Sequence, residues 1–283
     1  MIKILLIFLT MCGAVFSLEI KDSKVYDDYG NSIKLKEYKK IVVYNYGVVE
    51  ILYKLESQDE IVAIGNHRNS IWPEEKTKDL PLAGPISKPS VEKILSFNPD
   101  LVIFNVMGNK VDELKKIGVP SLIYSNKSLE NIIGNIEVLG RLTNKKKESL
   151  KVANELEKQL NSLKNKEKLK GKVLILYSTN PPSSFSKDSL PVEILELLGL
   201  NVITPSFGKK SIISSEYVLS ENPDIIIGTR GVKNIDDVKK AIPLIEETKA
   251  FKNNKIYKID SNILLRGSHR VFDEIEKVYK KLK

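Results

Sequence analysis

Seven side chains suited to holding a ligand lie at or just beyond the ends of predicted strands. Aromatic rings pack against flat apolar surfaces, and guanidinium groups bind carboxylate or catecholate oxygens through paired hydrogen bonds. Histidine adds a nitrogen that can coordinate a metal ion. These residue types predict a cleft for a planar or anionic ligand, formed by Tyr46, His67, Arg68, Trp72, Arg230, Arg266 and His269.

The elements that must position these side chains alternate between strand and helix. Apolar runs at 41–44, 61–64, 101–104 and 121–124 are typical of buried strands, and the same alternation resumes at 173–177. This pattern predicts parallel βαβ units. Ligands bind outside the carboxyl ends of the strands in such sheets, where the candidate side chains fall. We therefore expect an α/β protein.

The middle of the chain differs, because from Ser128 to about Leu169 it has little but helical periodicity. We predict a medium helix, a break near Thr143 and a long helix to about Asn165. A chain of 283 residues exceeds one ordinary core. We therefore expect two Rossmann-like lobes with central parallel sheets joined by one long helix. The expected boundaries are a signal peptide at 1–17, an N-terminal lobe at 18–142, the connecting helix at 143–170 and a C-terminal lobe at 171–283.

An internal repeat supports two related lobes. The segment Glu92–Ile103 aligns without a gap on Glu216–Ile227, and seven of the twelve positions are identical. Each copy reads as a helix, an Asn-Pro-Asp turn and a strand, since proline ends the helix and aspartate bonds to nearby backbone. Convergent turn chemistry explains the turn but not the glutamate seven residues before each proline.

The first residues predict export. Lys3 precedes an apolar run from Ile4 to Phe16, and Ser17 fits the last position before a signal-peptidase cut. Cys12 is the only cysteine, and it is either discarded with the signal or lipidated as an anchor. We expect a periplasmic protein, cut after Ser17.

Enzyme and nucleic-acid signatures are missing from the sequence. There is no phosphate-binding glycine loop, no nucleophile elbow and no cysteine nucleophile in the expected mature chain. The net charge of +9 is spread over interleaved lysines and glutamates, which argues against a nucleic-acid partner. Two distant histidines make a metal site built by the protein alone unexpected, and we predict no intrinsic cofactor.

The chain resembles the class III periplasmic binding proteins, which serve cobalamin, iron-siderophore and heme importers. The resemblance covers nearly all of the expected mature chain. The segments that carry it are 41–44 with Glu50, 80–84 leading to 89–92, 98–103, 180–185 and 265–270.

The resemblance implies two lobes with little hinge motion and a role for two glutamates. In the family, one surface glutamate on each lobe docks onto arginines of the transporter, and Glu92 and Glu216 stand at the matching positions. The implied partners are the permease subunits of an ABC transporter with its cytoplasmic ATPase. We expect the protein itself to be a monomer.

The resemblance leaves the ligand open. The tryptophan that precedes the motif glutamate in the cobalamin-binding member is absent, and Ala83-Gly84 stands in that region. His67 and His269 have no clear counterpart there, and they could complete the coordination of a chelated metal or of heme iron; Tyr46 could also do so as a phenolate. We expect an iron complex, either a ferric siderophore or heme. The alternative ligands are cobalamin and a nickel or cobalt chelate. A distant alternative function is an exported chelatase-like enzyme. A third hypothesis, an adhesin, would require an anchor or exposed aromatic repeats, and the sequence indicates neither.

Overall fold

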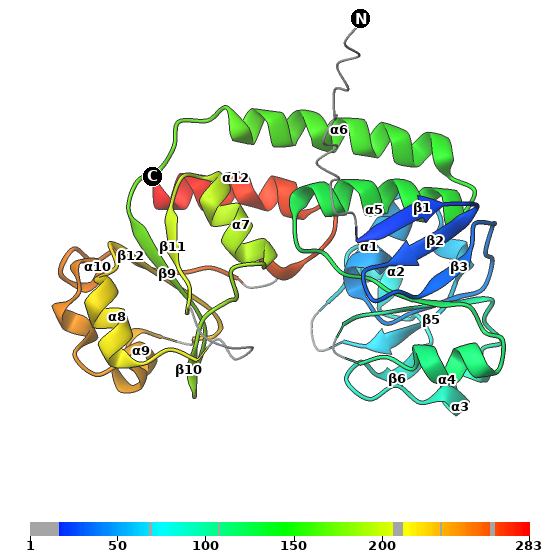
Figure 1. Cartoon of the computed structure of the whole chain (residues 1–283), viewed down its shortest axis with the longest axis horizontal. Helices are drawn as coiled ribbons and strands as arrows, with labels where there is room; N and C mark the ends of the chain where they lie inside the picture. The colour runs from blue at the N-terminus through cyan, green and yellow to red at the C-terminus, as the bar shows by residue number, and fades with distance from the viewer. Residues whose placement is uncertain (1–16, 68–69, 107, 206–211, 233, 261–263) are drawn as a thin grey trace, which may run out of the picture.

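Two α/β lobes make up the protein (Figure 1). The computed structural model describes residues 17–67, 70–106, 108–205, 212–232, 234–260 and 264–283. The structure confirms the predicted fold class, with a parallel sheet in each lobe and the long helix α6 (Lys146–Lys164) running between them.

The N-terminal lobe is built on a five-stranded sheet in the order β6-β5-β4-β7-β8, in which every pairing is parallel. Its strands are β4 (Ile41–Val43), β5 (Ile61–Asn66), β6 (Leu82–Pro85), β7 (Leu101–Phe104) and β8 (Ser121–Ile123). Its helices are α1 (Tyr46–Lys54), η1 (Gln58–Glu60), α2 (Glu74–Thr77), α3 (Val91–Leu95), α4 (Val111–Lys116) and α5 (Leu129–Leu142). The sequence predicted neither β6, which is four residues long and interrupted by Gly84 and Pro85, nor α2, a single turn in a polar stretch.

Four strands of the C-terminal lobe, β11-β9-β12-β13, repeat the order β5-β4-β7-β8. Strand β9 pairs in parallel with β11 and β12, β12 pairs with β13, and only β10 joins β9 antiparallel among the described strands. The strands are β9 (Lys172–Thr179), β10 (Pro182–Ser183), β11 (Asn201–Ile203), β12 (Ile225–Gly231) and β13 (Ile256–Lys258). The helices are α7 (Leu190–Leu197), α8 (Ser215–Glu221), α9 (Ile235–Ala241), η2 (Ile245–Glu247), α10 (Lys249–Lys252) and α12 (Val271–Leu282).

The internal repeat of the sequence corresponds to one structural device used twice. Asn98 and Asn222 both adopt left-handed backbone angles, with φ of 47° and 46°, and thereby turn the chain out of α3 and α8. Asp100 then accepts hydrogen bonds from the backbone of Lys39 and Lys40, at 2.8 and 2.9 Å. Asp224 accepts one from Lys172 at 2.8 Å. Each aspartate therefore ties the start of its own strand to the entry of the central strand of its lobe.

The apolar core is continuous between the lobes. Alternate residues of the central strands face opposite layers, as in β4, where Ile41 and Val43 face the shared core and Val42 faces a smaller cluster of the N-terminal lobe. In β9, Val173 and Ile175 likewise face the shared core, which also takes in α5, α6 and α12. Bending one lobe against the other would have to disturb this packing, which gives a physical reason for limited hinge motion.

The connection between the lobes has the predicted form. Helix α5 ends at Leu142, Thr143 begins the break, and α6 runs from Lys146 to Lys164. Its buried stripe includes Ala153, Leu156, Leu160 and Leu163. The exact boundaries proposed for the lobes stay predictions.

An antiparallel sheet of three short strands covers the start of the fold. It consists of β1 (Leu18–Lys21), β2 (Lys24–Asp27) and β3 (Ser32–Lys34); the predicted hairpin is present, and β1 was not predicted. Ser17 is 1% exposed, and its hydroxyl donates to the carbonyl of Ser125 at 2.5 Å. The neighbouring Leu18 N–H donates to Asn135 at 3.0 Å. These bonds tie Ser17 and Leu18 to the N-terminal lobe, and the cut after Ser17 stays a prediction.

Replacing either repeat aspartate by alanine should destabilise the fold, because the strand entries lose a hydrogen-bond acceptor. We expect Asp100→Ala and Asp224→Ala each to lower the free energy of unfolding by about 1–2 kcal/mol in chemical denaturation. Asp112→Ala, which removes an exposed carboxylate from α4, is the control and should change it by less than about 0.5 kcal/mol. Equal effects of all three substitutions would contradict the role given to the turns.

Candidate functional site

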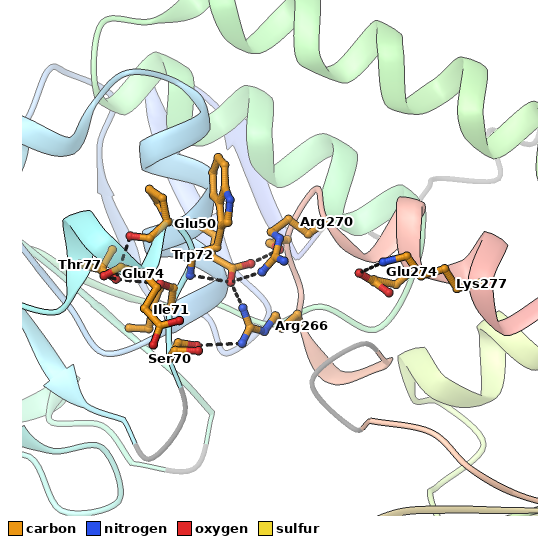
Figure 2. Close-up of polar contacts among 12 residues, drawn as sticks. Glu50, Ser70, Ile71, Trp72, Glu74, Thr77, Arg266, Arg270, Glu274 and Lys277 are labelled. Atoms are coloured by element: carbon orange, nitrogen blue, oxygen red, sulfur yellow. Dashed lines mark hydrogen bonds and ion pairs between the residues drawn. The ribbon is translucent and has the colours of Figure 1, made fainter.

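A buried carboxylate lies where the two lobes meet. Glu50 is 0% exposed, and both of its oxygens accept hydrogen bonds. Oε2 accepts from the Ser268 hydroxyl at 2.6 Å. Oε1 accepts from Arg266, from Arg270 at 3.3 Å and from the Trp72 N–H at 3.3 Å (Figure 2). We call these five residues the Glu50 cluster.

Helix α1 places Glu50 inside the protein because the helix is apolar around it. Asn45 caps the helix by accepting a hydrogen bond from the Val48 N–H at 3.2 Å, so the helix begins directly after β4. Val48, Val49, Ile51 and Leu52 are all buried, which leaves no solvated face for the carboxylate between them. A carboxylate in such a place requires charged or polar donors.

Three of the four donors, Arg266, Ser268 and Arg270, come from the segment between β13 and α12, which we call the crossing segment (residues 264–270). The crossing segment packs closely on the N-terminal lobe, where the Gly267 carbonyl accepts a hydrogen bond from the Tyr124 hydroxyl at 2.6 Å. A Cβ atom at Gly267 would lie 2.2 Å from the Asn126 side chain. Glycine at 267 therefore lets the crossing segment approach so closely without displacing the Asn126 amide.

Two aromatic groups flank the Glu50 cluster. On one side the Arg266 guanidinium lies 5.6 Å from the Tyr46 ring centre, and His67 meets Tyr46 edge-on at 5.0 Å. On the other side the Arg270 guanidinium lies 5.8 Å from the ring of Trp72. His269 meets Trp72 edge-on at 5.4 Å. Each arginine thus covers one ring, in the geometry of a cation–π contact.

The two histidines are held in the neutral form. Burial, with a smaller effect of the Arg266 charge, lowers the pKa of His67 to about 4. Burial, helped by Lys54 and Arg270, lowers the pKa of His269 to about 3. Both ring nitrogens of His67 and Nδ1 of His269 are buried without a hydrogen-bond partner among the described residues. An unprotonated imidazole with an unused nitrogen can act as a metal ligand.

A cavity of about 320 Å³ adjoins the Glu50 cluster. Residues 70–74, which we call the Trp72 loop, form one wall. Asp260, the crossing segment and the first turn of α12 form the other. Arginine and carboxylate side chains share its lining with one aromatic ring. The lining residues are Ser70, Ile71, Trp72, Glu74, Asp260, Arg266, Arg270, Val271 and Glu274.

The structure brings together five of the seven side chains predicted to bind a ligand: Tyr46, His67, Trp72, Arg266 and His269. Arg68 lies outside the described residues. Arg230 lies at the end of β12, one residue before its last residue Gly231; its contact with a ligand stays a prediction. Arg266 does not stand open at a loop mouth, since it is 8% exposed and paired with Glu50.

The two predicted docking glutamates occupy equivalent places in the lobes. Glu92 lies in the first turn of α3 behind the N-cap Ser90, and Glu216 in the first turn of α8 behind the N-cap Ser214. Both glutamates are exposed. Figure 1 shows α3 and α8 in different lobes, both away from α6.

Neither Glu50 nor Arg270 was among the residues predicted to form the site. The available signal was Glu50 itself, the one acidic residue in the apolar helix from Val48 to Leu55. A charge in an otherwise buried helix needs a partner, and the arginines at 266 and 270 were the candidates.

Two lobes with a cavity between them define a class of proteins that enclose a ligand between α/β domains. The model of the family described as periplasmic binding protein matches residues 41–263, and the chain belongs to this family. A vitamin B12-binding protein of Vibrio campbellii is 28% identical over 239 residues, which cover 81% of this chain and 84% of that protein. The Fe(3+)-citrate-binding protein YfmC of Bacillus subtilis is 26% identical over 278 residues, covering 93% and 88%.

The fold is also that of solved binding proteins. The periplasmic heme-binding protein RhuT from Roseiflexus, in its apo form, superimposes with a TM-score of 0.74 at 22% identity, covering 87% of this chain and 98% of that one. None of the helices in the described part of the chain has the length and apolar character needed to cross a bilayer. No group of three or more described His, Cys, Asp or Glu side chains is placed to hold a metal ion.

Mild acid should destabilise the protein through its histidines. In the unfolded chain both imidazoles take up protons near pH 6.5, whereas in the folded protein His67 and His269 stay neutral down to about pH 4 and pH 3. Because the unfolded state then binds more protons, the free energy of unfolding falls as the pH falls through this window. We expect a loss of about 2 kcal/mol per histidine between about pH 7 and pH 5, measured by chemical denaturation. The His67→Gln, His269→Gln double variant should lose less over the same interval, and an equal loss would contradict the prediction.

Proposed function

We propose that this chain is the extracytoplasmic substrate-binding protein of an ABC importer, and that it captures an iron complex, a ferric siderophore or heme, between its lobes. The observation that carries the proposal is the cavity between the Trp72 loop and the crossing segment. In this proposal the protein acts as a monomer, binds its ligand without chemical change and passes it to the permease subunits.

The cavity lining offers complementary contacts for a chelate. The Trp72 side chain is 37% exposed and offers a ring face to a flat or apolar part of the ligand. Arg270, whose side chain is 34% exposed, supplies hydrogen-bond donors to oxygens of the chelator. Glu74 and Asp260 accept hydrogen bonds from amide or hydroxyl groups. This mixture suits a ligand that carries rings, oxygens and polar hydrogens together.

The histidines extend the proposal to the metal. Neither ring lines the cavity, so a chelator with an open coordination position would have to reach past the lining for His67 or His269 to supply a neutral nitrogen. The lowered pKa of each ring supports this role because no proton has to leave before coordination. Tyr46, in contact with His67, would be the neighbouring oxygen ligand.

Cobalamin is the second candidate within the same class of transporter. The similarity to a vitamin B12-binding protein of Vibrio campbellii favours it, and the similarity to the Fe(3+)-citrate-binding protein of Bacillus subtilis favours an iron complex.

A direct titration tests the ligand. Trp72 is the only tryptophan and lines the cavity, so its fluorescence should be quenched by the ligand that the cavity accepts. We expect saturable quenching by hemin or by one of a panel of ferric siderophores and ferric citrate, and Trp72→Phe should abolish the signal. Saturation by cyanocobalamin alone would replace the iron complex by cobalamin and retain the transporter class.

The docking role of Glu92 and Glu216 gives a separate prediction. Exposed carboxylates on a rigid body can pair with arginines of a permease, and such pairs govern association more than folding. The Glu92→Ala, Glu216→Ala double variant should abolish uptake of the radiolabelled ligand into cells while its affinity in solution stays unchanged.

The matched control removes one other exposed glutamate from each lobe. Glu113→Ala combined with Glu196→Ala makes the same change in net charge and should leave uptake intact. Normal uptake by the Glu92, Glu216 variant, or a loss of its affinity in solution, would refute the docking assignment.

A further inference from the structure

The Glu50 cluster is more elaborate than stability requires. Burying an ion pair removes two charges from water, and an apolar pair of similar size is often as stable or more so. The Glu50 carboxylate instead accepts hydrogen bonds from four donors, three in the crossing segment and one in the Trp72 loop. Such contacts are directional, so they fix the orientation of the groups that make them.

The two arginines of the cluster have different exposures and therefore different capacities. Arg266 is 8% exposed, and its guanidinium also donates to the Ser70 carbonyl at 2.9 Å. Arg270 reaches Glu50 at 3.3 Å while a third of its side chain remains exposed beside the Trp72 ring. Arg266 thus joins the crossing segment to the Trp72 loop, and Arg270 has hydrogen-bonding capacity left for a ligand.

The hydrogen-bond donors to Glu50 come from both walls of the cavity. The Trp72 N–H belongs to the wall formed by the loop after β5, and Arg266 and Arg270 belong to the opposite wall. A single carboxylate, itself outside the cavity lining, therefore sets the spacing between the walls (Figure 2).

We propose that Glu50 is a positioning residue of the binding cavity: its carboxylate fixes Trp72 and Arg270 in the orientation that receives the ligand. This inference rests on the proposed function, since it assigns the Trp72 ring and the Arg270 guanidinium to ligand contact. It also assigns Arg266 to joining the walls, where the sequence had suggested a ligand contact. Preorganised groups bind more tightly because their ordering cost is met on folding.

The test uses Glu50→Gln in the full chain and two measurements. In the ligand-free protein, the emission maximum of Trp72 and its quenching by acrylamide should change, because the amide cannot hold both arginines and the Trp72 loop. In titrations with hemin, ferric citrate and cyanocobalamin, whichever probe binds the wild type should bind the variant about tenfold more weakly or worse, mainly through faster dissociation.

Glu193→Gln is the matched control. Glu193 on α7 is a partly buried carboxylate that accepts the Leu129 N–H of α5 at 3.0 Å and does not line the cavity. The Glu193→Gln variant should have the same Trp72 emission, the same quenching by acrylamide and the same affinity for the probe as the wild type. A purely structural role for Glu50 predicts instead that both variants differ from the wild type only in their unfolding midpoints.

Ser268→Ala and Glu50→Asp keep the inference testable if Glu50→Gln does not fold. Ser268→Ala removes only the 2.6 Å hydrogen bond to Oε2 and should change Trp72 emission in the same direction by a smaller amount. Glu50→Asp retains the charge, so it should restore emission and affinity partway toward the wild type. Wild-type emission, quenching and affinity in folded Glu50 and Ser268 variants would overturn the inference.

The ligand-free fluorescence separates this inference from the proposed function. If no probe binds the wild type, the proposed function fails, and the emission of Trp72 still decides whether Glu50 positions the cavity wall.

Discussion

A carboxylate removed from water must be met by donors, and at Glu50 this requirement joins distant parts of the chain. The carboxylate lies on α1, and its donors lie on the loop after β5 and on the crossing segment, more than 200 residues later in sequence. Without those donors Glu50 would be an uncompensated charge between Val49 and Ile51. The hydrogen bonds to Glu50 therefore couple the path of the crossing segment to the position of the cavity walls.

The shared apolar core makes this arrangement rigid. Helices α5, α6 and α12 contribute to a core that continues into both sheets, so the lobes cannot separate widely without exposing apolar surface. The Glu50 cluster lies at the edge of that core, beside the cavity. Packing sets the approximate relation of the lobes, and the directional hydrogen bonds of the cluster set the local geometry that a ligand would meet.

The repeated turn shows how two similar lobes arise from short signals. Asn98 and Asn222 turn the chain, Asp100 and Asp224 fasten it to the central strand, and Glu92 and Glu216 then occupy matching exposed positions. In the proposed docking role, limited motion between the lobes would keep these two charges at a nearly fixed separation, as alignment with a transporter requires.

The sequence by itself determined the fold class, the break and the long helix in the middle, and the repeated turn, because these follow from local periodicity and turn chemistry. It also indicated two of the residues that line the cavity, Trp72 and Arg266, since the carboxyl ends of parallel strands meet at one edge. It missed several short elements, among them β1, β6, β10, α2, α9 and α10, whose few residues carry too little periodicity to be distinguished from loops. Only the tertiary structure decided that Arg266 pairs with Glu50 while Arg270 stays partly exposed, because two arginines four residues apart look equivalent until the burial of each is known. Burial, and with it the choice between holding the protein together and contacting a ligand, is set by the packing of segments distant in sequence.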